Sequence, residues 1–173
     1  MICFETGSRA YPLRFTARSL LRACERGQTD VPTLLRGGVW ATTLLLYAAL
    51  CDALPHLTLR QAESLLTVHL ESEKKLNALM DKLTRAYDQS GFPADGITRT
   101  GFEQLLDTAA RAGFARTHTL YDLTYTEIVR ELSAFLALNR LRSGQGGSHF
   151  MMTDDEMRRA LLSMAGRDEH VDA

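Results

Sequence analysis

Hydrophobic and polar residues alternate at the start of the chain and then change to a helical spacing. A period of two runs through residues 2–5 and 11–15, and residues 6–10 between them can form a turn, which predicts a small β-hairpin. From Thr16 the apolar residues recur at helical positions, which predicts a first helix that ends at Gly27. A two-stranded ribbon is marginal alone and must pack one face on the helices. That face comprises Ile2, Phe4, Leu13 and Phe15.

Helical patterns cover the rest of the chain. Residues 39–54 are apolar nearly all round, Trp40 included, so we expect a buried central helix that Pro55 ends. Residues 73–90 form the clearest amphipathic helix, with one apolar stripe and one charged side. A short helix is expected to start at Asp30 with a proline in its first turn, which helices tolerate.

Helix starts and stops carry local signals of their own. A threonine followed three positions later by Glu or Gln satisfies two free backbone donors of the first turn. This capping box occurs at Thr58, Thr100, Thr124 and Thr153. Gly113 followed by Phe114 predicts a Schellman stop with its hydrophobic contact. These signals mark helix boundaries and carry no information on function.

The predicted fold is mainly α, with an N-terminal β-hairpin followed by a helical bundle and a smaller helical C-terminal module. Residues 93–99 contain Pro, Asp and Gly without a helical pattern and are the best candidate boundary. Glycine-rich residues 144–150 predict a flexible linker. The expected division is an N-terminal domain at 1–92, the linker 93–99, a C-terminal module at 100–143, the linker 144–150, and a short terminal helix with a frayed tail at 151–173.

Composition and charge narrow the classes of function. The chain has 173 residues, 45% of them hydrophobic, and a formal net charge of −1, so its charge favours neither nucleic acid nor a membrane. Its three cysteines are too few and too scattered for a disulfide framework, which suits a reducing compartment. No signal peptide is expected, and the apolar run 39–54 is shorter than the ~20 residues of a membrane-spanning helix. We therefore expect a cytoplasmic protein with neither a nucleic-acid nor a membrane partner.

Candidate chemistry is sparse. The five histidines lack metal-ligand spacing, apart from a weak pairing of His69 with Glu73. The glycine clusters at 37–38 and 144–147 lack the strand and helix context, and the following Lys-Ser/Thr, of a phosphate-binding loop. The sequence therefore predicts no metal site, no cofactor, no catalytic residue and no enzymatic activity.

One short segment is a candidate partner-binding site. Tyr121, Leu123 and Tyr125 lie in an apolar turn around the start of the capped helix at Thr124. A residue before a cap commonly packs on the first helical turn, so a hydrophobic staple and core packing are one interpretation. The other interpretation is an exposed aromatic anchor for a partner protein. The sequence leaves both open.

Several segments together resemble a known family. The first is a strand that directly enters the first helix, and the others lie in the helices that follow. These segments are residues 11–22, 44–50, 56–66 and 85–91. On this basis residues 1–92 resemble the tail assembly chaperones of long-tailed bacteriophages. The second part of the chain, with its aromatic turn and Leu-Thr step at 120–127, is similar to the C-terminal extension of the longer form of such chaperones.

The resemblance implies a non-enzymatic role. Such proteins coat the largely helical tape measure protein, keep it in solution and then help to recruit tail tube subunits, and they are absent from the finished particle. In many relatives the long form arises by translational frameshifting near the boundary that residues 93–99 occupy here. The resemblance thus implies two partners, the tape measure protein and the tail tube protein, in the cytoplasm of a host cell. It leaves self-association open.

The alternative interpretation is a small helical DNA-binding regulator. That function would need a helix-turn-helix with a basic recognition helix. A glycine-containing turn is present at Gly113, but the next capped helix starts only at Thr124, and its exposed face is mixed in charge.

Overall fold

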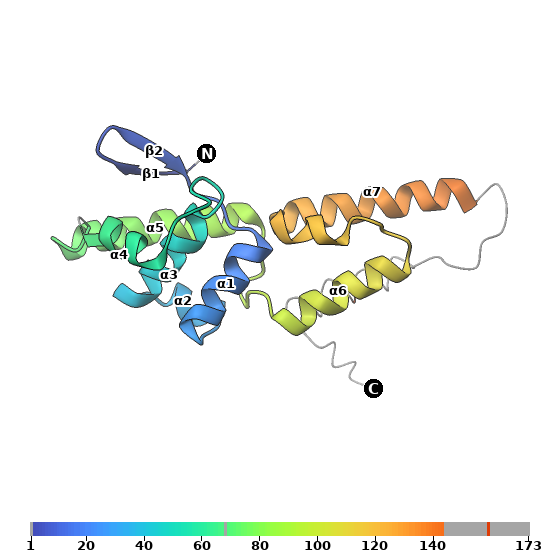
Figure 1. Cartoon of the computed structure of the whole chain (residues 1–173), viewed down its shortest axis with the longest axis horizontal. Coiled ribbons are helices and arrows are strands. Elements are labelled where there is room, and N and C mark those ends of the chain that lie inside the picture. The colour runs from blue at the N-terminus through green and yellow to red at the C-terminus, as the bar shows by residue number, and fades with distance from the viewer. Residues whose placement is uncertain (1, 68, 144–158, 160–173) are drawn as a thin grey trace.

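The protein consists of a β-hairpin followed by helices, which confirms the predicted fold class (Figure 1). The structure, a computed structural model, describes residues 2–67, 69–143 and 159. The predicted linker 144–150 and the terminal segment 151–173, with the capping box at Thr153, lie outside these residues apart from Arg159. The elements are β1 (Cys3–Thr6), β2 (Arg9–Pro12), α1 (Ala17–Gly27), α2 (Val31–Leu35), α3 (Val39–Leu50), α4 (Leu59–Thr67), α5 (Glu73–Ser90), α6 (Arg99–Arg111), the 3-10 helix η1 (Thr117–Asp122) and α7 (Tyr125–Ser143).

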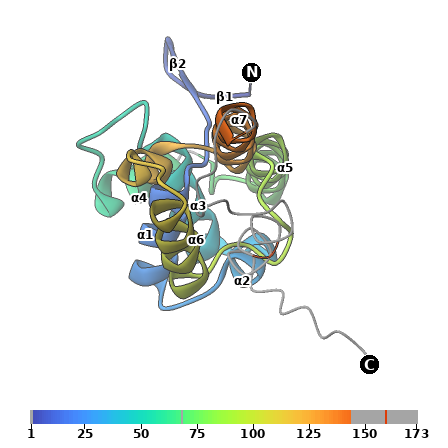
Figure 2. The same ribbon diagram turned by 90° about the vertical axis from the view of Figure 1, so that its right-hand side faces the viewer.

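The two strands pair antiparallel, with Thr6 opposite Arg9. The turn is therefore shorter than the predicted 6–10, because β2 already begins at Arg9. Gly7 has a φ of +58°, and two-residue hairpin turns place a positive φ at this first loop position. Arg9 and Ala10 are exposed where the hairpin projects from the helices, so they lack the hydrophobic alternation by which a strand is predicted (Figure 2).

The apolar face of the hairpin and its continuation packs on the helices, as predicted. Phe4, Leu13 and Phe15 are buried, and Ile2 is half-buried against the same core. The hairpin therefore depends on the helical body for its stability.

The first helix starts where predicted but ends for a different reason. Thr16 caps α1 by accepting the Ser19 N–H, and the Ser19 hydroxyl accepts the Thr16 N–H in return. Gln28, with a φ of 49°, takes the left-handed position after the helix. Gly27 is instead needed for close packing, because a Cβ there would lie 2.5 Å from Cδ1 of Leu44 in α3.

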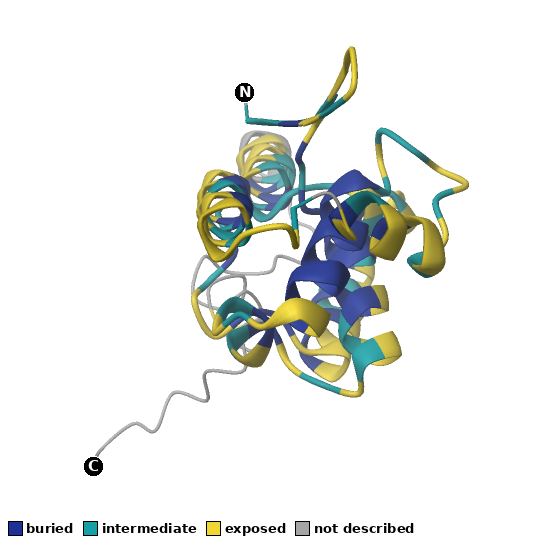
Figure 3. Ribbon diagram, turned by 90° about the vertical axis from the view of Figure 1, so that its left-hand side faces the viewer, coloured by how far each residue is buried: buried dark blue, intermediate teal, exposed yellow. Residues whose placement is uncertain are grey.

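Helix α3 is the buried centre of the fold, as the sequence predicts, and every residue from 41 to 50 is buried (Figure 3). The predicted end at Pro55 is wrong, because α3 ends at Leu50. If the helix continued, the Ala49 carbonyl would accept a hydrogen bond from the next turn. Instead it accepts the Arg14 N–H at 3.0 Å. The segment leading into α1 thus binds the end of α3.

Two further helix boundaries agree with the sequence. The capping box at Thr58 is confirmed, since the Thr58 N–H donates to Gln61 Oε1 at 2.8 Å and Thr58 Oγ1 accepts the Gln61 N–H at 3.2 Å. Helix α5 has the predicted bounds of 73–90, starts at a cap made by Ser72, and packs on α3.

The capping box predicted at Thr100 is wrong. Helix α6 starts at Arg99, and Thr98 is its cap, accepting the Gly101 N–H at 3.1 Å. This earlier start places Ile97 before the cap and Phe102 at the fourth helical position, and both are buried. These are the positions of a hydrophobic staple, which favours Thr98 over Thr100 as the cap.

The end of α6 confirms the predicted Schellman stop. Gly113 has a φ of +89° and donates its N–H to the Ala110 carbonyl, while the Phe114 N–H donates to the Ala109 carbonyl, both at 2.9 Å. The capping box at Thr124 is confirmed at the start of α7.

Aromatic side chains run continuously from the N-terminal helices to α7. The ring of Phe15 lies 5.7 Å from that of Tyr87, Tyr87 lies 6.1 Å from Phe92, and Phe92 lies 5.9 Å from Tyr125. Two residues of the predicted linker 93–99 are also buried. The chain on either side of this linker therefore shares one core, and its division into separate modules stays a prediction.

Candidate functional site

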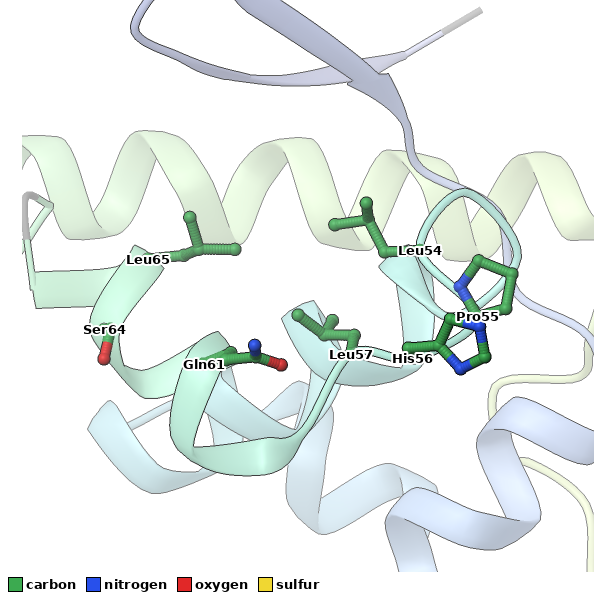
Figure 4. A pocket seen from close by; sticks show the side chains of 7 residues that line it. All are labelled: Leu54, Pro55, His56, Leu57, Gln61, Ser64 and Leu65. Carbon is green, nitrogen blue, oxygen red and sulfur yellow. The ribbon is translucent and has the colours of Figure 1, made fainter.

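An apolar hollow of ≈ 510 Å³ lies between the α3–α4 connection and α4. Leu54, Leu57 and Leu65 are half-buried there and point toward one another (Figure 4). Backbone bonds shape the connection, because the Leu54 N–H donates to the Leu50 carbonyl at 2.8 Å and the Leu57 N–H to the Leu54 carbonyl at 2.9 Å. A volume of this size is typical of ligand-binding sites.

Two polar side chains around this hollow, Gln61 and Ser64, form hydrogen bonds within the protein, and His56 lies at its edge (Figure 4). Gln61 Oε1 accepts from the backbone and hydroxyl of Thr58, and the Ser64 hydroxyl donates to the Arg60 carbonyl at 3.0 Å. The hollow therefore offers apolar contact rather than a set of converging polar groups. This chemistry suits the binding of apolar side chains.

A second, smaller hollow of ≈ 300 Å³ separates the hairpin from α5. Phe4 and His69 line it, with their ring centroids 5.3 Å apart. Burial, with the nearby positive charges of Lys75 and Lys82, lowers the pKa of His69 below its ordinary value. The His69 ring packs on the Phe4 ring, so a contact within the protein accounts for its place beside this hollow.

One aromatic residue, Trp40, is exposed where the sequence pattern predicts burial. Trp40 was expected inside the central helix, but it is 48% exposed, and Val39 beside it is exposed as well. Both lie in the first turn of α3, directly after the helix-breaking residues 37–38. Only their position at the start of the apolar run distinguishes Val39 and Trp40 from the buried residues that follow.

The three candidate partner-binding residues are half-buried where η1 and α7 meet the rest of the protein. The Tyr121 ring packs edge-on against Phe102, with centroids 4.8 Å apart. The Leu123 carbonyl accepts the Ala17 N–H at 3.1 Å, and Tyr125 packs on Phe92. Intramolecular packing thus accounts for Tyr121, Leu123 and Tyr125, and their role in partner binding stays a prediction.

Across residues 2–67 and 69–143, no group of three or more His, Cys, Asp or Glu side chains is placed to hold a metal ion. In the same part of the chain, no helix combines the length and the apolar character needed to cross a bilayer.

Comparison with known proteins found no matching family model, no matching curated protein and no matching solved structure.

Proposed function

We propose that the protein is a tail assembly chaperone of a long-tailed bacteriophage, which binds the tape measure protein and helps to recruit tail tube subunits. The order of elements carries this proposal. The resembling segments fall, in order, on β2 with α1, on α3, on α4 with its lead-in, and on the end of α5. These elements pack on one core, so the resemblance extends over one continuous unit rather than over scattered pieces.

The apolar hollow at α4 is the proposed contact for the tape measure protein. An amphipathic helix presents apolar side chains one turn apart, and a hollow lined by leucines can receive them. Because only three leucines supply the apolar contact, binding through the hollow would be modest, and polymerising tube subunits could displace the chaperone. In this proposal the C-terminal helices, with Tyr121, Leu123 and Tyr125, serve the recruitment of the tube protein. The complex would form in the host cytoplasm, and the chaperone would be absent from the finished particle.

Co-expression with the tape measure protein tests this function. We expect the two proteins to copurify and the tape measure protein to become more soluble. Leu65→Glu, which places a charge in the hollow, should abolish copurification, while Leu138→Glu on the exposed side of α7 should not. If the wild-type protein neither copurifies nor changes the solubility, the chaperone proposal fails. If a folded Leu65→Glu variant still copurifies, the hollow is not the contact.

We do not favour the DNA-binding regulator. A helix-turn-helix joins its helices by a short turn. Here η1 (Thr117–Asp122) lies between α6 and α7.

A further inference from the structure

Arginine residues recur at every fourth position from the lead-in of α1 to its end. They are Arg14, Arg18, Arg22 and Arg26. Positions four apart on a helix lie on the same side, so the three arginines of α1 form one stripe. A hollow of ≈ 630 Å³ separates this stripe from the end of α3 and from η1. The charged residues that line it are Arg14, Arg18, Arg22, Asp52 and Asp122.

The first two arginines are fully engaged within the protein. Arg14 binds the carboxylates of Asp52 and Glu127. Arg18 makes a two-pronged contact with Asp122, at 2.5 and 3.1 Å, and its guanidinium lies over the Tyr121 ring. These contacts neutralise both arginines and both of the aspartates on the rim.

The next two arginines carry the positive charge of the stripe that no ion pair compensates. Arg22 lines the hollow and is exposed, and Arg26 is exposed one turn further along α1. In the described part of the chain, neither forms an ion pair. The Arg26 guanidinium lies 4.7 Å from the centroid of the Tyr47 ring, which holds it in place before any ligand arrives.

We propose that this arginine stripe binds an acidic segment of a partner protein, with Arg22 and Arg26 taking two of its carboxylates. Residues one turn apart on a helix are separated by about 6 Å along the axis, which matches neighbouring acidic side chains on one face of a peptide. Guanidinium groups bind carboxylates with two parallel hydrogen bonds. Because Tyr47 already orders Arg26, less conformational freedom is lost on binding.

A protein segment fits this surface better than nucleic acid does. Proteins that bind DNA commonly contact about 6–10 phosphates, whereas only two arginines of the stripe are free of ion pairs. Asp52 and Asp122 on the rim are paired with Arg14 and Arg18, so this part of the hollow offers no further positive charge to a continuous phosphate backbone. A short segment with two acidic residues needs only the two arginines that are free of ion pairs, Arg22 and Arg26.

Fluorescence anisotropy with a labelled octaglutamate peptide and the full chain at low ionic strength tests the proposal. We expect saturable binding that weakens with added salt, and a loss of about tenfold or more in Arg22→Glu/Arg26→Glu. The matched control is Arg116→Glu/Arg130→Glu, which changes the net charge equally at two exposed arginines outside the stripe. It should bind the peptide nearly as well as the wild type does.

Because Arg26 also packs on Tyr47, its replacement could destabilise the protein. A single variant at Arg22 separates an effect on binding from an effect on folding. Arg22→Gln should keep the circular dichroism spectrum and thermal melt of the wild type and still weaken peptide binding. The proposal is overturned if the peptide does not bind, or if both double variants lose affinity equally. It is also overturned if a short DNA duplex binds more tightly than the peptide and the binding depends on the same two arginines.

Discussion

Arg14 and Glu127, 113 positions apart in the chain, form an ion pair that joins the entrance of α1 to the first turn of α7. Glu127 Oε2 accepts a hydrogen bond from Nη2 of Arg14 at 2.5 Å and a second one from the Thr124 N–H at 2.8 Å. One oxygen therefore both caps α7 and holds it to the N-terminal helices. Nη1 of Arg14 binds the carboxylate of Asp52, which lies just after α3. Three elements thus meet at one side chain.

Removing Arg14 should destabilise the protein more than removing an ordinary surface cation. In Arg14→Ala, the half-buried Glu127 carboxylate loses its charged partner, and we expect the free energy of unfolding to fall by about 1–2 kcal/mol. Urea unfolding followed by circular dichroism measures this change. Lys75→Ala, which removes an exposed pair with Glu71 four residues away, should cost about 0.5 kcal/mol or less. Equal losses in the two variants would show that the Arg14 contact contributes no more than a surface pair.

Glu127 should also give stability a specific dependence on pH. Burial raises its pKa, but hydrogen bonds from Thr124 and Arg14 outweigh this and hold the pKa below the ordinary value of 4.5. Because the folded pKa lies below the unfolded one, the stabilisation is complete above the unfolded pKa and is lost as the pH falls through the folded pKa. Glu127→Gln can keep the cap but cannot titrate. The stability difference between wild type and this variant should therefore shrink between about pH 5 and pH 3, as measured by urea unfolding, and a constant difference would contradict the assignment.

Local signals in the sequence predicted much of the fold. The caps at Thr58 and Thr124, the stop at Gly113 and the bounds of α5 depend on neighbouring residues, so they can be derived from spacing alone. The capping box predicted at Thr100 failed because two threonines could cap the same helix and the burial of Ile97 decided between them.

The candidate sites were much harder to derive from the sequence. The apolar pattern places Leu54 in the central helix, whereas it lies in the connection that shapes the apolar hollow. The ion pair of Arg14 with Glu127 joins residues far apart in the chain and leaves no periodic pattern. The spacing of the α1 arginines is visible in the sequence, but which of them lack an ion partner depends on the tertiary contacts.

Two glycines with similar backbone angles should respond differently to alanine. Gly96 has a φ of +78°, and a Cβ there would lie 2.5 Å from Cβ of Val31 in α2. Gly113 has a φ of +89° with no atom within 4 Å of such a Cβ. Gly113→Ala should cost about 1–2 kcal/mol from backbone strain, and Gly96→Ala about 2–5 kcal/mol because the clash adds to the strain. Thermal and urea unfolding would test this order, and equal costs would show that the loop before α6 can move away from α2.

Deleting residues 97–173 should leave a folded but less stable protein. The fragment keeps the hairpin and α1–α5, but Phe92 loses its contact with Tyr125, and the Ala17 N–H loses the Leu123 carbonyl at 3.1 Å. We expect a helical circular dichroism spectrum, a lower melting temperature and increased binding of the dye ANS to the uncovered apolar surface. Adding Phe92→Ser to the fragment should reduce the dye binding, which locates that surface. A fragment that is unfolded by circular dichroism would show instead that the two parts of the chain fold as one cooperative unit.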